Sequence, residues 1–88
     1  MNNLTTHLDF ISDSNNREYH KSIWYNFVSD HLKDENISTT SINKVELYVR
    51  KKYNANFRYH QITPNMFVSV DFIFDKKEDK VAFELRYL

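Results

Sequence analysis

The first third of the chain carries a helical pattern of apolar residues. Between residues 17 and 33 they recur at spacings of three and four: Tyr19, Ile23, Trp24, Phe27, Val28 and Leu32. This spacing places them on one broad stripe of an α-helix. Glu18 suits the positive end of that helix, and Lys33 suits the negative end. Because the chain contains no glycine, we expect Asn36 to take the left-handed conformation that closes the helix.

The segment from 41 to 53 admits two interpretations. A helix would bury Ile42, Val45, Val49 and Tyr53, with Thr40 or Ser41 as the cap and Arg50, Lys51 and Lys52 at the end where cations are favoured. A strand would instead bury Val45, Leu47 and Val49 in strict alternation. We favour the helix, because cap, charge placement and length agree with one another.

The last third of the chain alternates between apolar and polar residues, as β-strands do. One face of a hairpin would carry Val68, Val70, Phe72 and Phe74 opposite Val81, Phe83, Leu85 and Tyr87, across the polar connection 75–80. A preceding strand, 56–62, would enter through a turn at 63–65. The pattern predicts a single domain over residues 1–88, an α+β fold. In it, one or two helices pack on one face of a three- to four-stranded antiparallel meander.

Composition excludes several kinds of chemistry. Without glycine, the chain cannot form the phosphate-binding loops of Walker or Rossmann type. Without cysteine, it has no disulfide, no thiolate nucleophile and no Cys-ligated metal. The four histidines lack metal-binding spacing, and no serine occupies a strand-to-helix elbow. We therefore expect no enzyme, no catalytic residue, no cofactor and no metal ion.

Charge and hydropathy bear on location and partners. The 12 basic and 12 acidic residues cancel, so the overall charge favours no particular partner. Apolar runs are only a few residues long, whereas a membrane span needs about 20. The first residues also lack the features of a signal peptide. We expect a cytoplasmic protein that does not enter a membrane.

The segment between Glu46 and Asp71 contains no acidic residue. Its cations and histidine, Arg50, Lys51, Lys52, Arg58 and His60, are interleaved with the rings of Tyr53, Phe57 and Tyr59. Such a basic, aromatic segment is typical of a surface that binds phosphates, stacks bases or meets an acidic protein. The competing interpretation is that Phe57 and Tyr59 point into the core while Arg58 and His60 are solvated.

Aromatic residues make up 16% of the chain, so they either fill the core or form a contact surface. Tyr25 lies off the helical stripe, and Phe67 and Ile73 lie on the outer face of the expected hairpin. An outer face with such residues is usually covered. We leave open whether the cover is a second helix, a partner protein, a second copy of the chain, or the amino-terminal arm with Leu4, Leu8, Phe10 and Ile11.

In the expected hairpin, Asp71 and Glu84 stand opposite each other, with Arg86 on the same face. Two adjacent carboxylates can hold a divalent ion. We interpret them instead as part of a solvated face, in which Arg86 relieves the repulsion between like charges.

These observations predict a small non-catalytic protein that binds another macromolecule and inhibits or regulates it. We expect the kind of inhibitor that phages and mobile elements encode against a host or defence protein. A protein is the expected partner, and a homodimer also fits. The alternative is a DNA- or RNA-binding module that uses the segment 50–60.

Overall fold

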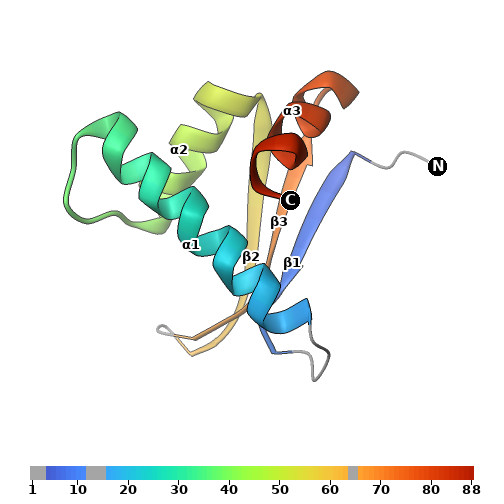
Figure 1. The fold of residues 1–88 in the computed structure, drawn as a ribbon. Coiled ribbons are helices and arrows are strands. Elements are labelled where there is room, and N and C mark those ends of the chain that lie inside the picture. Colours follow the sequence, from blue (N-terminus) through green and yellow to red (C-terminus); the bar gives the residue numbers. More distant parts are fainter. Residues whose placement is uncertain (1–3, 12–15, 64–65) are drawn as a thin grey trace.

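The computed structural model describes residues 4–11, 16–63 and 66–88 and confirms the α+β class. Its elements, in chain order, are β1 (Thr5–Asp9), α1 (Asn16–Glu35), α2 (Ile42–Tyr53), β2 (Ala55–Thr63), β3 (Met66–Phe74) and α3 (Lys77–Tyr87). The three strands form one antiparallel sheet in the order β1-β3-β2. Figure 1 shows α1 crossing in front of the sheet and α2 beside β2, with β1 at the opposite edge of the sheet from β2.

The predicted first two helices are both present. Asn36 closes α1 with a φ of 54°, as expected. Ser41 caps α2, where its Oγ accepts a hydrogen bond from the backbone N–H of Lys44 at 3.4 Å. Asn54, with a φ of 53°, ends α2 and turns the chain directly into β2. The helical interpretation of 41–53 is therefore confirmed, and β2 begins beside the end of α2.

The predicted hairpin between 67–74 and 81–88 is wrong, because the second segment forms α3. The spacing of four between Phe83 and Tyr87 suits a helix, and both side chains are buried. Val81 and Leu85, which the hairpin would have buried, are 44% and 82% exposed. α3 as a whole includes Lys, Glu, Ala, Leu and Arg, all good helix formers, and a few alternating apolar residues do not separate a strand from a helix.

The third strand of the sheet comes instead from the amino-terminal arm. β1 pairs with β3 over its whole length, and β2 pairs with the other side of β3. Leu8 and Phe10 are buried in the core, so this arm does not lie across the outer face of the sheet. Residues 64 and 65 of the expected turn lie outside the described residues.

The aromatic residues fill the core. All six phenylalanines whose side chains the structure describes are buried: Phe10, Phe27, Phe57, Phe72, Phe74 and Phe83. The ring of Phe72, on β3, lies 5.1 Å from that of Phe27 on α1 and 4.7 Å from that of Phe83 on α3. In a chain without glycine, large rings fill the core, and the contacts of Phe72 join α1 and α3 to the sheet.

Candidate protein-binding groove

The structure divides the basic segment between two elements. Arg50, Lys51 and Lys52 lie on α2, whereas Arg58 and His60 lie on β2. Tyr53 is buried and its ring packs 5.2 Å from that of Phe83, so it does not contribute to a contact surface. Phe57 is also buried, while Arg58 and His60 are exposed. The competing interpretation is therefore right for Phe57, Arg58 and His60 but wrong for Tyr59, whose side chain is 38% exposed.

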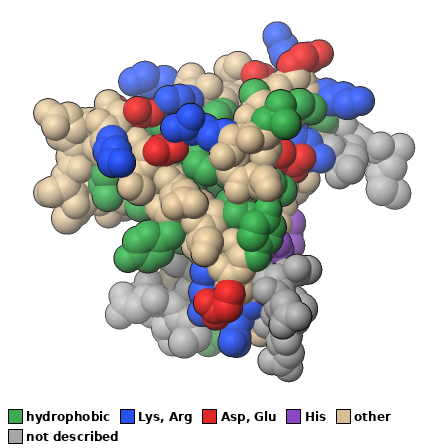
Figure 2. Space-filling view, in the orientation of Figure 1, with side chains coloured by type: hydrophobic (Ala, Val, Ile, Leu, Met, Phe, Trp, Pro, Cys, Tyr) green, Lys and Arg blue, Asp and Glu red, His purple; other side chains and the backbone are tan. Residues whose placement is uncertain are grey.

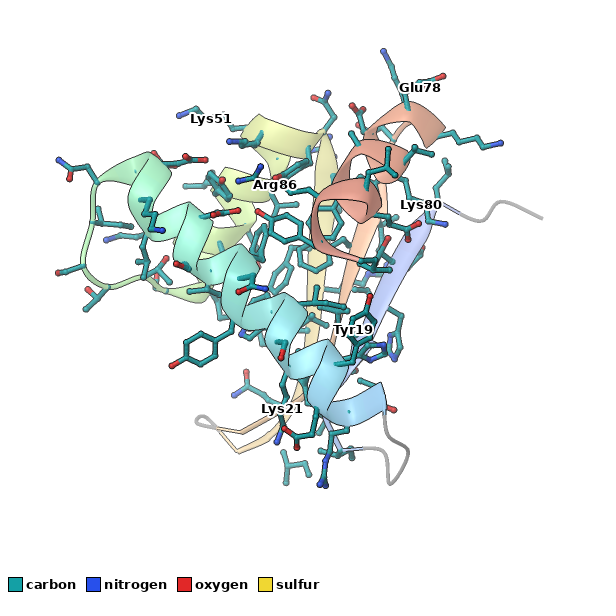
Figure 3. The ribbon with its side chains drawn as sticks, in the orientation of Figure 1. Tyr19, Lys21, Lys51, Glu78, Lys80 and Arg86 are labelled. Carbon is teal, nitrogen blue, oxygen red and sulfur yellow. The ribbon has the colours of Figure 1, made fainter. Side chains whose placement is uncertain are left out.

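Carboxylates that are distant in the sequence lie close to Arg50, Lys51 and Lys52 at the end of α2. Arg50 Nη1 lies 2.6 Å from Asp75 Oδ2, and Lys52 Nζ lies 2.5 Å from Asp34 Oδ2. Lys51 extends outward at the end of α2 (Figure 3), where its Nζ is 3.9 Å from a carboxylate oxygen of α1. Figure 2 shows Lys and Arg interspersed with Asp and Glu on this face. The local excess of cations in the sequence is therefore largely balanced in space.

A groove of about 680 Å³ runs between α2 and β2, and we call it the α2–β2 groove. It is lined by Asn43, Glu46, Leu47, Arg50, Ala55, Asn56, Phe57, Arg58 and Ile73. Three of the residues singled out from the sequence, Arg50, Arg58 and Ile73, thus come together. Leu47 was missed, although it is 72% exposed and supplies an apolar side chain at the rim. The available signal was its position off the buried stripe of α2.

The two arginines of the groove differ in their surroundings. Arg50 is held from both sides, because it donates to Asp75 at 2.6 Å and to Asn56 Oδ1 at 2.8 Å. Arg58 has no ion pair among the residues that the structure describes, although it stands opposite Asp71 in the sheet. The carboxylate of Asp71 is bound instead by a histidine of β1. Arg58 therefore presents a guanidinium that is free to bind an incoming acceptor.

The outer face of the sheet also brings together two histidines and an aspartate. His7 Nδ1 lies 2.5 Å from Asp71 Oδ1, and His60 Nε2 lies 3.9 Å from Asp71 Oδ2. This cluster could not be predicted from the sequence, because it depends on the pairing of β1 with β3. Within residues 4–11, 16–63 and 66–88, no three His, Cys, Asp or Glu side chains are arranged to hold a metal ion.

The predicted facing pair of Asp71 and Glu84 does not exist. Asp71 lies on the outer face of the sheet, whereas Glu84 lies on α3 and accepts a hydrogen bond from Thr6 Oγ1 at 2.7 Å. Arg86 binds Asp30 of α1, with 2.8 Å between Nη2 and Oδ2, and Figure 3 shows it on the side of α3 toward α1. The pair was wrong because it assumed a strand at 81–88.

Two further residues singled out from the sequence are Tyr25 and Phe67, of which Tyr25 lies outside the α2–β2 groove. Tyr25 is exposed on α1, beside a small apolar hollow formed with Trp24, Val28, Ser29 and Leu32. Phe67 belongs to β3, but its side chain lies outside the described residues. Tyr25 therefore does not join Arg50, Arg58 and Ile73 in one surface.

The shifted pKa values belong to contacts between helices. A hydrogen bond from Tyr87, at 2.5 Å, holds the pKa of Asp30 below its ordinary value, and Arg86 lowers it further. Burial raises the pKa of Tyr87 itself, and the hydrogen bond to Asp30 raises it further. One turn further along α1, burial raises the pKa of Tyr48, which donates to Asp34 at 2.6 Å. These groups fasten α1 to α3 and α2.

Comparison with known proteins found no matching protein family, no matching curated protein and no matching solved structure. In the described part of the chain, no helix has the length and apolar character needed to cross a membrane.

Proposed function

We propose that this chain is a small non-catalytic protein that binds another protein through the α2–β2 groove and thereby inhibits or regulates it. The observation that carries the proposal is the combination of exposed Leu47, half-buried Ile73 and the unpaired guanidinium of Arg58 in one groove. Apolar anchors beside an arginine are typical of protein interfaces. Whether a phage or mobile element encodes the protein stays a prediction.

The chemistry of the groove defines the partner segment that fits it. Leu47 and Ile73 would contact an apolar side chain, and Arg58 would bind a carboxylate, with which a guanidinium forms two parallel hydrogen bonds. Arg50 is already fixed by Asp75 and Asn56, so it loses little freedom when a partner binds. We therefore propose a partner segment that combines an apolar and an acidic residue.

Nucleic-acid binding is the weaker proposal. Arg50, Lys51 and Lys52 each lie within 4 Å of a carboxylate, and phosphates would have to compete with these carboxylates. Arg58 and His60 alone would supply few phosphate contacts. Affinity for duplex DNA should change with salt by a log–log slope of about −0.9 for each phosphate contact. A slope steeper than about −4 would favour nucleic acid over protein.

Because the chain has no cysteine, a single one can be placed in the groove and labelled uniquely. Leu47→Cys carrying a benzophenone label would be irradiated in a lysate of the cells in which the protein naturally acts. Leu85→Cys is the matched control, since Leu85 is an equally exposed leucine on α3, outside the groove.

We expect position 47 to cross-link to a specific protein and position 85 not to do so. An excess of unlabelled wild type should compete, whereas Arg58→Glu should compete poorly because it reverses the charge of the groove. Cross-links to nucleic acid, or equal labelling from both positions, would contradict the proposal.

A further inference from the structure

The backbone hydrogen bonds show which peptide groups of β1 are left at the open side of the sheet. Phe74 N–H donates to the carbonyl of Leu4, and Phe10 N–H donates to the carbonyl of Val68. Hydrogen-bonded pairs in an antiparallel ladder recur at every second residue. The even-numbered residues of β1 therefore bond to β3. The N–H and C=O groups of Thr5, His7 and Asp9 point away from the sheet.

Only part of this open side is available. The N–H of Asp9 is already bound, because it donates to His20 Nδ1 of α1 at 2.9 Å. Thr5 and His7 are exposed, and in the described part of the chain nothing bonds to their outward peptide groups. Figure 1 shows no described helix or strand beyond β1. β1 thus offers two adjacent pairs of donors and acceptors.

An apolar flank of α3 lies on the same side of the molecule. Glu84 marks the flank over β1, because it accepts the hydrogen bond of Thr6, and Figure 3 shows Lys80 on that side of α3. At about 100° per residue, Glu84 lies about 100° around the helix from Phe83, Leu88 about 140° and Val81 about 160°. Leu88 and Val81 are both exposed. They lie beyond Glu84, between the side of α3 over β1 and the side turned away from the sheet.

We infer that β1 pairs with β1 of a second copy of this chain, in antiparallel orientation about a two-fold axis at Thr6. In this register Thr5 of one copy stands opposite His7 of the second copy, and each pair exchanges two backbone hydrogen bonds. The four bonds use the open groups and leave the bond from Asp9 to His20 intact. A register centred on His7 would pair Thr5 with Asp9, and would break that bond.

The two-fold axis favours a second copy over an unrelated strand. Antiparallel pairing about an axis perpendicular to the sheet keeps the helices of both copies on the same face of the combined sheet. The two α3 helices then become neighbours, and the flank with Val81 and Leu88 meets its own equivalent, as an isologous interface requires. The product is a six-stranded sheet with a β2 strand at each end. Each dimer would therefore present two α2–β2 grooves.

Proline at residue 5 tests the inference directly. An edge strand tolerates proline at its first residue or where the N–H faces away from the sheet, and Thr5 meets both conditions. Thr5→Pro should therefore fold as a monomer but lose the Thr5 donor in both copies. Thr5→Val is the matched control, because it keeps the N–H and the β-branched shape.

Sedimentation equilibrium measures the outcome. Because the contact is short, we expect weak association of the wild type, with a dissociation constant of about 10 to 100 µM. Thr5→Pro should weaken it at least about tenfold, and Thr5→Val by less than about twofold. A wild type that remains monomeric at about 1 mM would overturn the inference. So would a folded Thr5→Pro variant that associates as the wild type does.

Amide hydrogen exchange of the wild type gives a second measurement that does not depend on any variant folding. The amides of Thr5 and His7 should gain protection as the protein concentration rises, because they are bonded only in the dimer. The amide of Asp9 should be protected at every concentration, since His20 binds it within one copy. A dimer in which the exchange of Thr5 and His7 does not depend on concentration would place the interface elsewhere.

Discussion

Truncating Phe83 should remove much of the stability of the fold, whereas truncating Leu85, two residues away, should remove almost none. Phe83 is fully buried, with ring centroids 4.7 Å from Phe72, 4.9 Å from Tyr87 and 5.2 Å from Tyr53. Truncation of such a ring to alanine costs about 3 to 5 kcal/mol. A chain of this length has a total stability of about 4 to 13 kcal/mol, at 0.05 to 0.15 kcal/mol per residue.

Leu85 is the matched control, because its side chain is largely exposed on the opposite side of α3. An exposed substitution away from special features changes stability by less than about 0.5 kcal/mol, and alanine is the best helix former. In a strand facing Val70, Leu85 would have been a core residue whose truncation costs about 2 to 5 kcal/mol. The two substitutions together therefore distinguish a helix from a strand at 77–87.

Urea unfolding of both variants measures the difference, followed by far-ultraviolet circular dichroism and by the fluorescence of the single tryptophan. Trp24 reports on the core, because its ring stacks 5.7 Å from that of Phe57. We expect Phe83→Ala to lose about 3 to 5 kcal/mol in urea and, in a separate thermal scan, to melt roughly 12 to 40 °C lower, at 4 to 8 °C for each kcal/mol. A loss of 2 kcal/mol or more in Leu85→Ala would refute the assignment of α3, on the cost of removing a core leucine.

Three further results are expected. The free energy of unfolding should fall as pH drops below 6.5, because burial lowers the pKa of His31 in the folded state and the unfolded chain therefore binds the proton first. Urea titrations at pH 7 and pH 5 should show a smaller fall of this free energy in His31→Leu than in the wild type. Asp30→Asn should lower the free energy of unfolding by about 1 to 3 kcal/mol, because it weakens the acceptor of the Tyr87 hydroxyl. In a double-mutant cycle, the losses from Asp30→Asn and Tyr87→Phe should not be additive. Replacing Lys51 and Lys52 by glutamine should change the affinity for the partner identified by cross-linking by less than about twofold, as measured by calorimetry, because exposed ion pairs contribute little. A larger loss would show that the contact surface includes the basic residues at the end of α2.

The parts of the fold that follow from local patterns could be predicted from the sequence. α1 and α2 combine a buried stripe with caps at Asn36 and Ser41, so several local signals agree. α3 could not be predicted, because the alternation of 81–87 fits a strand while the same segment buries Phe83 and Tyr87 as a helix. β1 is only five residues long, and its place in the sheet depends on a partner more than 60 residues away.

The candidate site was predicted in part for the same reason. Arg58 and Ile73 were singled out because their residue types stand out locally, and both line the α2–β2 groove. The balance of charge around Arg50 and Lys52 could not be predicted, because Asp75 lies 25 residues from the first and Asp34 lies 18 residues from the second. A charge count along the sequence therefore overstated how basic this surface is.

The central claim is that the α2–β2 groove binds a partner protein. Its most direct test is the affinity of two leucine variants for the partner that cross-linking identifies. Isothermal titration calorimetry would compare wild type, Leu47→Ser in the groove and Leu85→Ser on α3, two exposed leucines on helices that differ in location. We predict that Leu47→Ser weakens binding at least about tenfold while Leu85→Ser leaves it unchanged, because a buried interface anchor is worth more than about 1.4 kcal/mol. Equal affinities of Leu47→Ser and wild type would contradict binding through the α2–β2 groove.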